Sequence, residues 1–257
     1  MNLFSLLVGI GASFGLLLAA RSAPPGAELR RVGGGLLVLL AALTGARAGF
    51  VWLNPHLFQA DGWAALRAWE GGLSFPGGLA AAVLAVGLVA LAQGESLAHT
   101  ADGLVVMFVP LGVMVWLGCG AAGCAFGAAL SEQYPWSLPV MELDGSLTYR
   151  FGLPYLAAPG LLVFAWLAEK IIAGSRVPGL RASALGLAIG LHILLFTALR
   201  GDDPPRFQDV RLDTAAALFL GGLSLLGLIG LAIARLRSSL ADQAPGANRE
   251  TWFSPKD

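Results

Sequence analysis

Charged side chains are scarce in this 257-residue chain, at 12% of residues, whereas soluble domains carry about 25%. Basic and acidic residues, 16 of each, cancel to a formal net charge of zero. A nucleic-acid partner is therefore not expected, because phosphate binding needs a clustered basic surface. Hydrophobic residues make up 56% of the chain and the mean hydropathy is +0.73, which indicates a protein embedded in a membrane.

Cysteine is nearly absent as well, since the chain holds only Cys119 and Cys124, both in one apolar stretch. This excludes the disulfide framework of a small secreted domain. On a helix, a five-residue spacing puts the two thiols on different faces, and each is most simply a small apolar side chain. A glycine-rich phosphate loop, a metal-ligand cluster and a Ser/His/Asp set are also lacking, so we expect no metal and no cofactor.

Long hydrophobic runs recur along the whole chain, and a spanning helix needs about 20 mostly apolar residues. We therefore expect an all-α, polytopic bundle of about seven transmembrane helices. The candidate spans are Leu3–Ala20, Val32–Leu53, Phe75–Gln93, Gly103–Leu130, Leu153–Ala168, Leu180–Leu199 and Leu212–Ala234. We expect the first to remain as a helix, because residues 1–5 lack the positive charge of a signal peptide and basic residues follow the apolar run.

The fourth span is unusually long and rich in glycine in its second half. Its glycines there are Gly118, Gly120, Gly123 and Gly127. Irregular backbone at membrane depth survives only where protein or a cavity shields it, so one prediction is a kink, a break or a close helix contact. The other is a close-packed face of small residues, such as Gly123 and Gly127 four positions apart.

The distribution of basic residues indicates that the N-terminus is outside and the C-terminus is in the cytoplasm. In that orientation the cytoplasmic set is Arg21, Arg30, Arg31, Lys170, Arg176, Arg181, Arg235, Arg237, Arg249 and Lys256. The outer set is Arg67, Arg150, Arg200, Arg206 and Arg211. We expect a single transmembrane domain over residues 1–237 and a disordered cytoplasmic tail over residues 238–257, which has no apolar period.

Two connections on the outer side are long. Residues 54–74 contain Trp63 and Trp69, which suit a short helix lying in the membrane interface. Residues 131–152 are rich in proline and aromatic residues and predict a cap made of turns. Either connection could shelter a site or could simply anchor the protein at the interface.

Ionisable groups inside apolar segments mark candidate functional residues, because each costs roughly 2.5 kcal/mol or more at a helix centre. Arg47 lies within the second span and needs an anionic partner, either a lipid phosphate or an internal carboxylate such as Glu70. His192 lies within the sixth span, where a satisfied core histidine is the commoner outcome than a catalyst. Arg200 ends that span and is followed by Asp202 and Asp203, which could cap it.

Asp102 lies near the start of the fourth span, where a carboxylate complements the positive end of a helix dipole. We expect this carboxylate to be a helix cap rather than a catalytic group.

Several ordered segments together resemble the prolipoprotein diacylglyceryl transferases of bacteria. Residues 69–78 read Trp-Glu-Gly-Gly-Leu-Ser-Phe-Pro-Gly-Gly and are similar to that family's most specific signature, which has histidine in place of Pro76. Residues 45–50 resemble its Gly-Ala-Arg-x-Gly-aromatic run, and residues 117–127 resemble the cysteine-containing variant of its central motif. Weaker likenesses lie at residues 6–12, 101–102 and 199–203, so the resemblance covers about residues 6–235.

The resemblance implies a multi-pass protein of the bacterial inner membrane that transfers a diacylglyceryl group from phosphatidylglycerol to a preprolipoprotein signal-peptide cysteine. The thiolate is the nucleophile, so the chemistry needs a base near the thiol and cations on the phosphate. The resemblance then suggests His192 or Cys124 as the base, with Arg47 and Arg200 on the lipid phosphate. The motif glycines that it marks are Gly71, Gly72, Gly77, Gly118, Gly123 and Gly127.

Several positions depart from the family pattern. Pro76 stands where the family has histidine, and Trp116 stands where it has the arginine that opens the central motif. Proline cannot transfer a proton, and tryptophan cannot clamp a phosphate. Cys119 and Cys124 replace an asparagine and a glutamate, and Ile193 occupies the place of the sixth-span arginine.

Three hypotheses follow. The first is a diacylglyceryl transferase or a variant with altered substrate, acting on phosphatidylglycerol or another anionic phospholipid. The second is a catalytically inactive relative that binds phospholipid or the lipoprotein precursor. A transporter or channel is the third, and no repeated half-motifs support it. Arg47, Arg200 and His192 around one cavity would favour the first hypothesis, and dispersed positions would favour the second.

Overall fold

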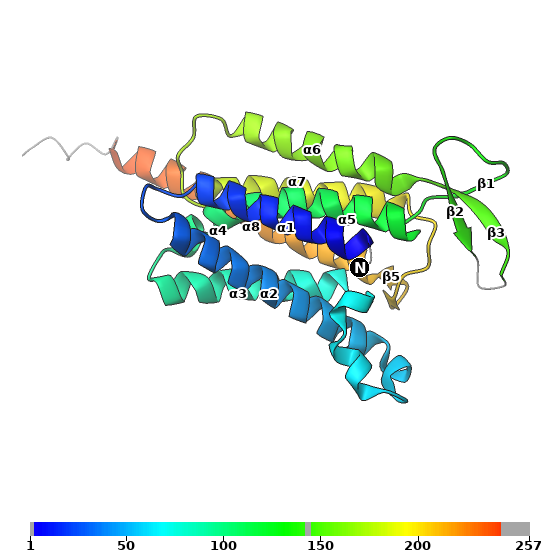
Figure 1. Cartoon of the computed structure of the whole chain (residues 1–257). Helices are drawn as coiled ribbons and strands as arrows, with labels where there is room; N and C mark the ends of the chain where they lie inside the picture. The colour runs from blue at the N-terminus through cyan, green and yellow to red at the C-terminus, as the bar shows by residue number, and fades with distance from the viewer. Residues whose placement is uncertain (1–2, 142–144, 243–257) are drawn as a thin grey trace, which may run out of the picture.

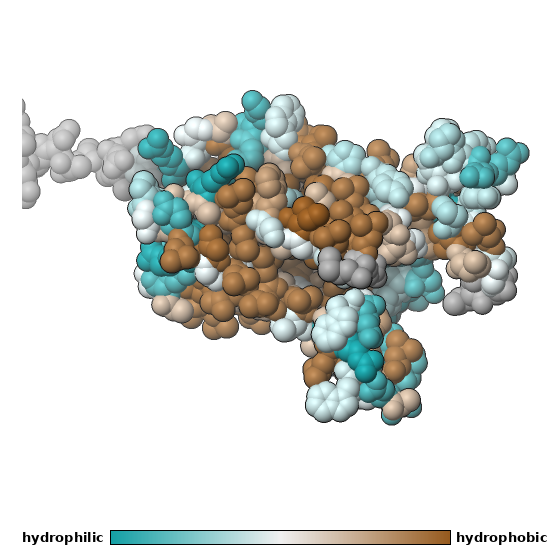
Figure 2. Space-filling view, viewed as in Figure 1, coloured by the Kyte–Doolittle hydropathy of each residue, from teal (hydrophilic) through white to brown (hydrophobic). Residues whose placement is uncertain are grey.

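The chain is described by a computed structural model that covers residues 3–141 and 145–242. Its helices are α1 (Leu3–Arg21), α2 (Glu28–Leu53), α3 (Phe75–Gln93), α4 (Leu97–Leu104), α5 (Phe108–Ala122), α6 (Leu153–Ile171), α7 (Leu180–Ala198) and α8 (Leu212–Asp242). The long helices run side by side along one axis (Figure 1). Hydrophobic surface covers the middle of the bundle, and hydrophilic residues gather toward its two ends (Figure 2). The predicted polytopic helical membrane protein is thus confirmed.

The number of crossings follows from the helices and from where the chain turns. Six segments of the described chain are long and apolar enough to span a membrane: α1, α2, α3, the unit α4–α5, α7 and α8. The seventh expected span is helix α6, which is not in that set but runs the length of the bundle from the strands to α7 (Figure 1). With α6 included, the chain crosses the bundle seven times and α1 begins at the end opposite to the end of α8.

We call the end at which α1 begins the outer end, because the basic residues concentrate at the opposite end. The connections α2–α3, α5–α6 and α7–α8 all lie at the outer end (Figure 1). Helix α8 continues to Asp242 and so includes residues 238–242, which the sequence analysis had assigned to the tail. Residues 243–257 lie outside the described part of the chain.

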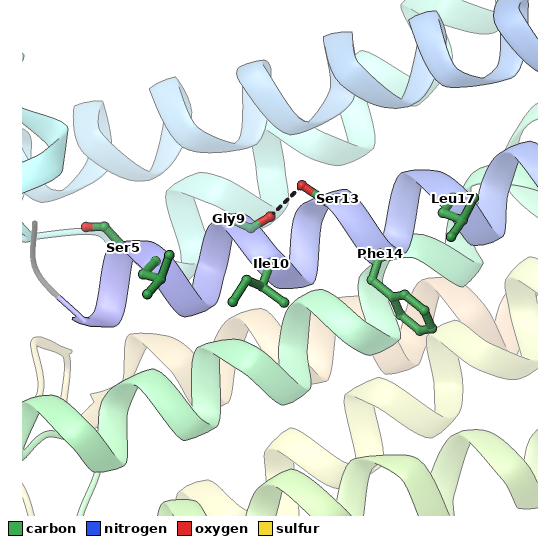
Figure 3. Close-up of a pocket in the computed structure, with 7 residues that line it drawn as sticks. Ser5, Gly9, Ile10, Ser13, Phe14 and Leu17 are labelled. Atoms are coloured by element: carbon green, nitrogen blue, oxygen red, sulfur yellow. Dashed lines mark hydrogen bonds between the residues drawn. The ribbon is translucent and has the colours of Figure 1, made fainter.

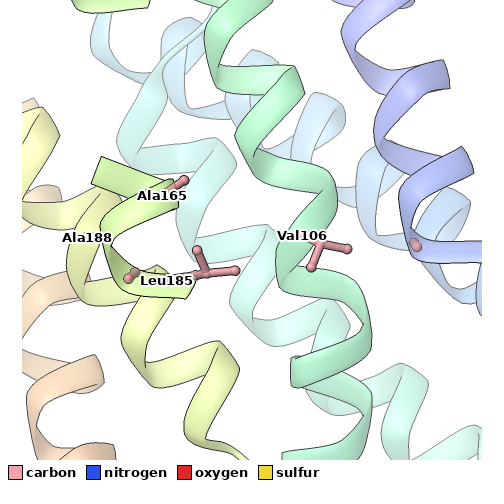
Figure 4. Close-up of a cluster of buried hydrophobic side chains, with 6 residues drawn as sticks. Val106, Ala165, Leu185 and Ala188 are labelled. Atoms are coloured by element: carbon pink, nitrogen blue, oxygen red, sulfur yellow. The ribbon is translucent and has the colours of Figure 1, made fainter. Parts of the chain in front are cut away.

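Small side chains dominate the core, as expected where helices associate in lipid through close van der Waals packing. Val106, Ala165, Leu185 and Ala188 gather in one cluster drawn from the α4–α5 unit, α6 and α7 (Figure 4). The most extensive helix contact, between α2 and α3, depends on glycine. A Cβ atom at Gly77 would collide with the backbone carbonyl of Gly45, so the two helices approach each other too closely for larger residues.

The glycine-rich fourth span does break. It begins in the short helix α4, which passes through a 3₁₀ segment at Val105–Met107 into α5, and α5 ends at Ala122. Gly123 adopts the left-handed conformation, with φ of +69°, and terminates the helix. The example of a helical face made by Gly123 and Gly127 was wrong, because both residues lie beyond the end of the helix. Close packing does occur at Gly118 and Gly120, where a Cβ atom would meet the rings of Phe4 and Tyr155.

Asp102 is a cap, but for a different helix from the one expected. Its Oδ2 accepts a hydrogen bond from the backbone N–H of Gly179 at 2.6 Å, and its Oδ1 accepts one from Ala182 at 2.7 Å. These N–H groups belong to the start of α7, which has no capping side chain of its own. A carboxylate there satisfies orphan donors and complements the helix dipole.

Replacing Asp102 with alanine is expected to lower the free energy of unfolding by about 1–2 kcal/mol, the usual cost of a lost cap. Thermal unfolding in detergent would measure the shift. Glu132→Ala, which removes an exposed carboxylate at the outer end, is the matched control and should leave stability unchanged. Equal stability of the two variants would contradict a capping role for Asp102.

The two long outer connections differ from the prediction in detail. Residues 131–152 were expected to form turns, but the chain there forms a three-stranded antiparallel sheet in the order β1–β3–β2. Its strands are β1 (Ala129–Leu130), β2 (Ser137–Met141) and β3 (Leu147–Phe151). A second, two-stranded hairpin pairs β4 (Arg206–Phe207) with β5 (Val210–Arg211). The class is therefore a helical bundle with small sheets at the outer end rather than strictly all-α.

The 54–74 connection holds three short 3₁₀ turns in place of the expected helix. They are η1 (Pro55–Phe58), η2 (Gly62–Leu66) and η3 (Ala68–Glu70). Trp52, Trp63 and Trp69 are 83%, 76% and 67% exposed in the isolated chain. Tryptophan favours the lipid headgroup region, so these exposed rings fit the predicted position of this connection at the interface.

Candidate functional site at the outer end

The segments that carry the motifs converge on the outer end of the bundle. Residues 69–78 lead into α3, residues 117–127 lead out of α5, and residues 199–203 follow α7. The last two segments touch directly, because the N–H of Gly201 donates to the carbonyl of Phe126 at 2.8 Å. A Cβ atom on Gly201 would collide with the Gly127 carbonyl, so this contact requires glycine.

Arg47 is buried, at 8% exposure, and its guanidinium binds the 54–74 connection rather than a carboxylate. Its Nε donates to the carbonyl of Ala65 at 2.8 Å, and its Nη2 donates to that of Ala64 at 2.5 Å. Its Nη1 donates to the carbonyls of Gly71 and Gly72 at 2.6 and 3.0 Å. Arginine carries five N–H donors, so four acceptors nearly exhaust it.

The internal carboxylate expected for Arg47 is therefore not the partner observed. Glu70 pairs with Arg67 at 3.6 Å, and the cation of Arg47 is surrounded by carbonyls and by the rings of Phe50 and Phe58. Sequence reasoning missed these partners because carbonyl groups occur at every residue and leave no signal in the sequence. In this structure Arg47 organises the loop that carries the 69–78 signature.

The glycines of the signature allow the backbone to approach Arg47 and α2. Gly71 and Gly72 have φ values of +98° and +66°. A Cβ on Gly72 would meet the ring of Phe50 and the guanidinium of Arg47. Pro76, where the family has histidine, lies in the first turn of α3, where the missing N–H costs nothing. This position supplies a helix start and offers no titratable group.

The glycine-rich segment after α5 brings the two cysteines together. The N–H of Cys124 donates to the carbonyl of Cys119 at 2.9 Å, and that of Gly123 donates to the carbonyl of Gly120 at 3.4 Å. This is the Schellman pattern of a helix C-terminus, in which the residues at either side of the turn come into contact. The prediction that the thiols point to different faces was wrong, because it assumed that the helix continues through Cys124.

Arg200 belongs to a compact cluster of two arginines and two aspartates, which we call the Arg200 cluster: Arg200, Asp202, Arg211 and Asp213. Arg200 binds Asp202 through Nε at 2.9 Å and through Nη2, and binds Asp213 through Nη1 at 2.6 Å. Arg211 donates to Asp202 at 3.0 Å. The predicted capping of Arg200 by a following aspartate is thus observed for Asp202, whereas Asp203 pairs with Arg206.

The electrostatics of this region are those of a neutral, partly buried network. Burial would raise the pKa of Asp202, but hydrogen bonds and charges from Arg200 and Arg211 outweigh it and hold the pKa below the ordinary 3.8. Burial acts to lower the pKa of Arg200, and Asp202 and Asp213 more than reverse this effect. The pKa of the Cys124 thiol is lowered, chiefly by a hydrogen bond with Cys119 and further by the charge of Arg200, against the opposing effect of burial.

The lowered pKa of Asp202 predicts a pH dependence of stability. A depressed carboxyl pKa contributes stability above the unfolded value near 4, and this contribution is lost as the pH falls through the folded pKa. The free energy of unfolding should therefore be flat between about pH 7 and 5 and fall below about pH 4. In Asp202→Asn, the free energy of unfolding measured by urea titration should fall less steeply below about pH 4. An unchanged decrease in this free energy with pH would show that Asp202 is not the carboxyl group responsible.

His192 is fully buried in an aromatic environment. Its Nε2 lies 2.9 Å from the carbonyl of Ala157, which accepts a hydrogen bond, and its ring packs against Trp116, Phe164 and Phe196. Its Nδ1 has no partner among the described residues. With an exposed fraction of 0%, His192 cannot touch a substrate in this conformation.

The comparison with known families agrees with this arrangement of motifs. A family model described as prolipoprotein diacylglyceryl transferase matches residues 1–226. The chain belongs to that family. The match covers helices α1 to α7 and about the first half of α8.

Individual relatives of the diacylglyceryl transferase family are moderately similar. The protein named phosphatidylglycerol–prolipoprotein diacylglyceryl transferase from Aromatoleum aromaticum is 27% identical over 210 residues, which cover 80% of this chain and 76% of the relative. The protein of that name from Bradyrhizobium diazoefficiens is 30% identical over 200 residues, covering 76% and 67%. That from Methylibium petroleiphilum is 30% identical over 176 residues, covering 66% and 64%.

Compared with the family pattern, this diacylglyceryl transferase relative replaces charge by aromatic packing in its interior. Trp116, at the position of the family's motif arginine, packs on Phe196 and His192. Leu153 and Ala157 complete an apolar cluster around them. Arg47, Arg200 and His192 have separate sets of partners, so the structure does not gather the three around one cavity. Taken alone, these dispersed positions favour the inactive relative, whereas the family match over residues 1–226 favours the transferase.

Grooves on the surface of this family member are apolar. One, of about 600 Å³, follows α1 (Figure 3). It is lined by Ser5, Leu6, Gly9, Ile10, Ser13, Phe14 and Leu17. Another, of about 380 Å³, lies between α2 and α3. Neither is lined by a charged residue, so neither supplies a phosphate site, and no group of three or more metal-ligating side chains occurs in residues 3–141 and 145–242.

Proposed function

We propose that this protein transfers the diacylglyceryl group of phosphatidylglycerol to the cysteine thiol of a preprolipoprotein signal peptide. The observation that carries the proposal is the family match over residues 1–226. It is supported by the position of the motif segments, which all lie at one end of the bundle, where the segment after α5 contacts Gly201 beside the Arg200 cluster.

The reaction is a displacement at carbon. The acceptor thiolate attacks the glyceryl carbon that bears the phosphate, a carbon–sulfur bond forms and the carbon–oxygen bond to phosphate breaks. Glycerol 1-phosphate leaves with the electron pair, and the thiol proton goes to a base. Catalysis therefore needs a base beside the thiol and positive charge beside the departing phosphate.

Two features of the outer end fit these needs. Arg200 and Arg211 supply the cations, held by Asp202 and Asp213 until a lipid phosphate competes for their N–H groups. Nε of Arg211 is buried and makes no hydrogen bond among the described residues, so this N–H is a donor that a phosphate could satisfy once the cluster opens. Arg47 acts differently, since it positions the 69–78 loop through the carbonyls of Gly71 and Gly72.

The proposed base is Cys124 rather than His192. Cys124 is half-buried at the outer end and lies in the field of Arg200, whereas His192 is enclosed by aromatic rings. The lowered pKa of the Cys124 thiol favours its thiolate form, which can accept the proton of the acceptor cysteine.

Purified protein in nanodiscs that contain labelled phosphatidylglycerol, incubated with a lipobox peptide, tests the proposal. The product is the peptide that carries the diacylglyceryl thioether, measured by mass. Cys124→Ser should reduce the rate about 100-fold or more, as expected for loss of a general base. Arg206→Ala, which removes an exposed arginine of the same end, is the matched control and should keep full activity.

The lack of any thioether product, with a parallel relative from Aromatoleum aromaticum active in the same nanodiscs, would overturn the transferase function. Transfer that persists undiminished in Cys124→Ser would overturn only the assignment of the base.

A further inference from the structure

We propose that Cys119 and Cys124 form a reversible dithiol–disulfide pair at the outer end of α5. This site of oxidative modification is independent of the transferase function, because it rests on the geometry of the helix C-terminus.

The helix cap brings the two residues within disulfide range. The hydrogen bond from the N–H of Cys124 to the carbonyl of Cys119 measures 2.9 Å. Standard bond lengths add at most about 4 Å to it, so the two Cα atoms lie within roughly 7 Å. A disulfide spans Cα separations up to about 7 Å, so the backbone needs no rearrangement to accept one.

The side chains also face each other. In a Schellman motif the residues that flank the turn, which are Cys119 and Cys124 here, make a side-chain contact. The Cys119 thiol is the largest influence on the pKa of the Cys124 thiol, as expected for two side chains in contact. Gly123, with φ of +69°, creates this contact by reversing the chain between the two residues.

Accessibility and environment favour reaction at Cys124. Both thiols are free and partly exposed, so a small reagent or a partner thiol can reach them. The positive charge of Arg200 stabilises a thiolate at Cys124, and the thiolate is the form that attacks a disulfide. The outer end faces the compartment outside the inner membrane, where disulfides form and persist.

The oxidation proceeds by thiol–disulfide exchange with a disulfide-bearing oxidant. The Cys124 thiolate attacks one sulfur of the oxidant, a mixed disulfide forms and the other sulfur of the oxidant leaves as a thiolate. Cys119 then loses its proton and attacks the sulfur of Cys124, which expels the second sulfur of the oxidant. Two electrons and two protons pass in total from the pair to the oxidant, which ends as two thiols.

The disulfide would lock the turn that bears the outer-end contacts. The segment after Cys124 is tied to Gly201 through Phe126 and to β3 through Gly127, whose N–H donates to the carbonyl of Phe151 at 2.9 Å. In addition, and resting on the proposed function, oxidation removes the Cys124 thiolate and should abolish transfer until a reductant restores it.

The test counts free thiols in the full-length protein in detergent. The protein is equilibrated with oxidised glutathione or with dithiothreitol, then quenched with iodoacetamide, and its intact mass is measured. We expect both cysteines to be alkylated after dithiothreitol, and neither to be alkylated or glutathionylated after oxidised glutathione. Addition of dithiothreitol to the oxidised sample should restore alkylation of both.

Single variants distinguish the internal disulfide from other products. Cys119→Ser should end as a glutathione adduct at Cys124, because no second thiol can resolve the mixed disulfide. Gly123→Ala, which strains the left-handed turn, should reduce internal disulfide formation at least fivefold while both thiols stay reactive. Two glutathione adducts on the unchanged chain, or alkylation of both thiols after oxidation, would overturn the proposal.

The outcome does not depend on enzymatic activity. A chain that oxidises internally but shows no thioether product in either state would sustain the thiol pair and contradict the proposed function. A chain that is active but never forms the internal disulfide would support the transferase function and contradict the Cys119–Cys124 pair.

Discussion

Replacing Arg47 with alanine is expected to release the 54–74 connection from the bundle. The guanidinium is the donor for four backbone carbonyls, those of Ala64, Ala65, Gly71 and Gly72. Each buried carbonyl left without a donor costs about 1–3 kcal/mol, unless the loop opens and water satisfies it. The free energy needed to open the 54–74 connection should therefore be several kcal/mol lower in Arg47→Ala than in the unchanged chain.

Trypsin cleavage after Arg67 measures this opening, because Arg67 lies within the connection and its side chain is 41% exposed. We expect cleavage of Arg47→Ala to be about 100-fold faster, since 1.4 kcal/mol of opening free energy corresponds to a factor of ten. Arg47→Lys should be intermediate, because an ammonium group has three donors and no planar fork. In both Arg47 variants, transfer activity should decrease as the 54–74 connection becomes less ordered.

Arg206→Ala is the control, since it removes an exposed arginine that does not hold the loop. Equal cleavage rates for Arg47→Ala and Arg206→Ala would show that the carbonyl contacts do not hold the connection. If Arg47→Ala kept both slow cleavage after Arg67 and full transfer activity, Arg47 would have no role in the functional site.

Replacing Arg200 with alanine is expected to cost both stability and transfer, through separable causes. Asp202 and Asp213 would then share one cation, Arg211, in a region where their side chains are only 20% and 11% exposed. Removing one partner of a buried ion pair costs about 3–5 kcal/mol, and partial exposure reduces that cost to about half. The melting temperature should fall by several degrees.

A double variant distinguishes the structural contribution from the catalytic one. In Arg200→Met with Asp202→Asn, one carboxylate faces one arginine, so the melting temperature should recover toward that of the unchanged chain. If Arg200 holds the phosphate, transfer should stay about 100-fold or more below the unchanged rate despite the recovered fold. Recovery of both would assign Arg200 a purely structural role.

The hydrophobic pattern correctly predicted the membrane-spanning helices. It did not predict the strands at the outer end. Seven apolar runs gave the seven crossings, including α6, because the need for about 20 apolar residues is a property of the bilayer and can be counted along the chain. The sheet formed by β1, β2 and β3 was missed, since its short strands lie among proline and turn residues. Strand pairing is decided by contacts between distant segments, which no local pattern contains.

The candidate residues were found because charge in an apolar helix is costly, and that cost is visible in the sequence. Their partners were not. Arg47 binds carbonyls, Asp102 caps α7 instead of its own helix, and His192 lies among Trp116, Phe164 and Phe196. A sequence shows that a buried polar group must be satisfied, whereas only the packing of the helices shows which groups come within hydrogen-bond range.

The sequence by itself determined that this protein crosses a membrane repeatedly and carries the motifs of the diacylglyceryl transferase family. Hydropathy and the order of the motifs are properties of the chain and need no coordinates. The tertiary structure alone decided that α5 ends at Gly123, that the two cysteines meet, and that Arg200 is paired with two aspartates. These features depend on one left-handed residue and on loops brought together by helices far apart in sequence, and such distances arise only when the bundle packs.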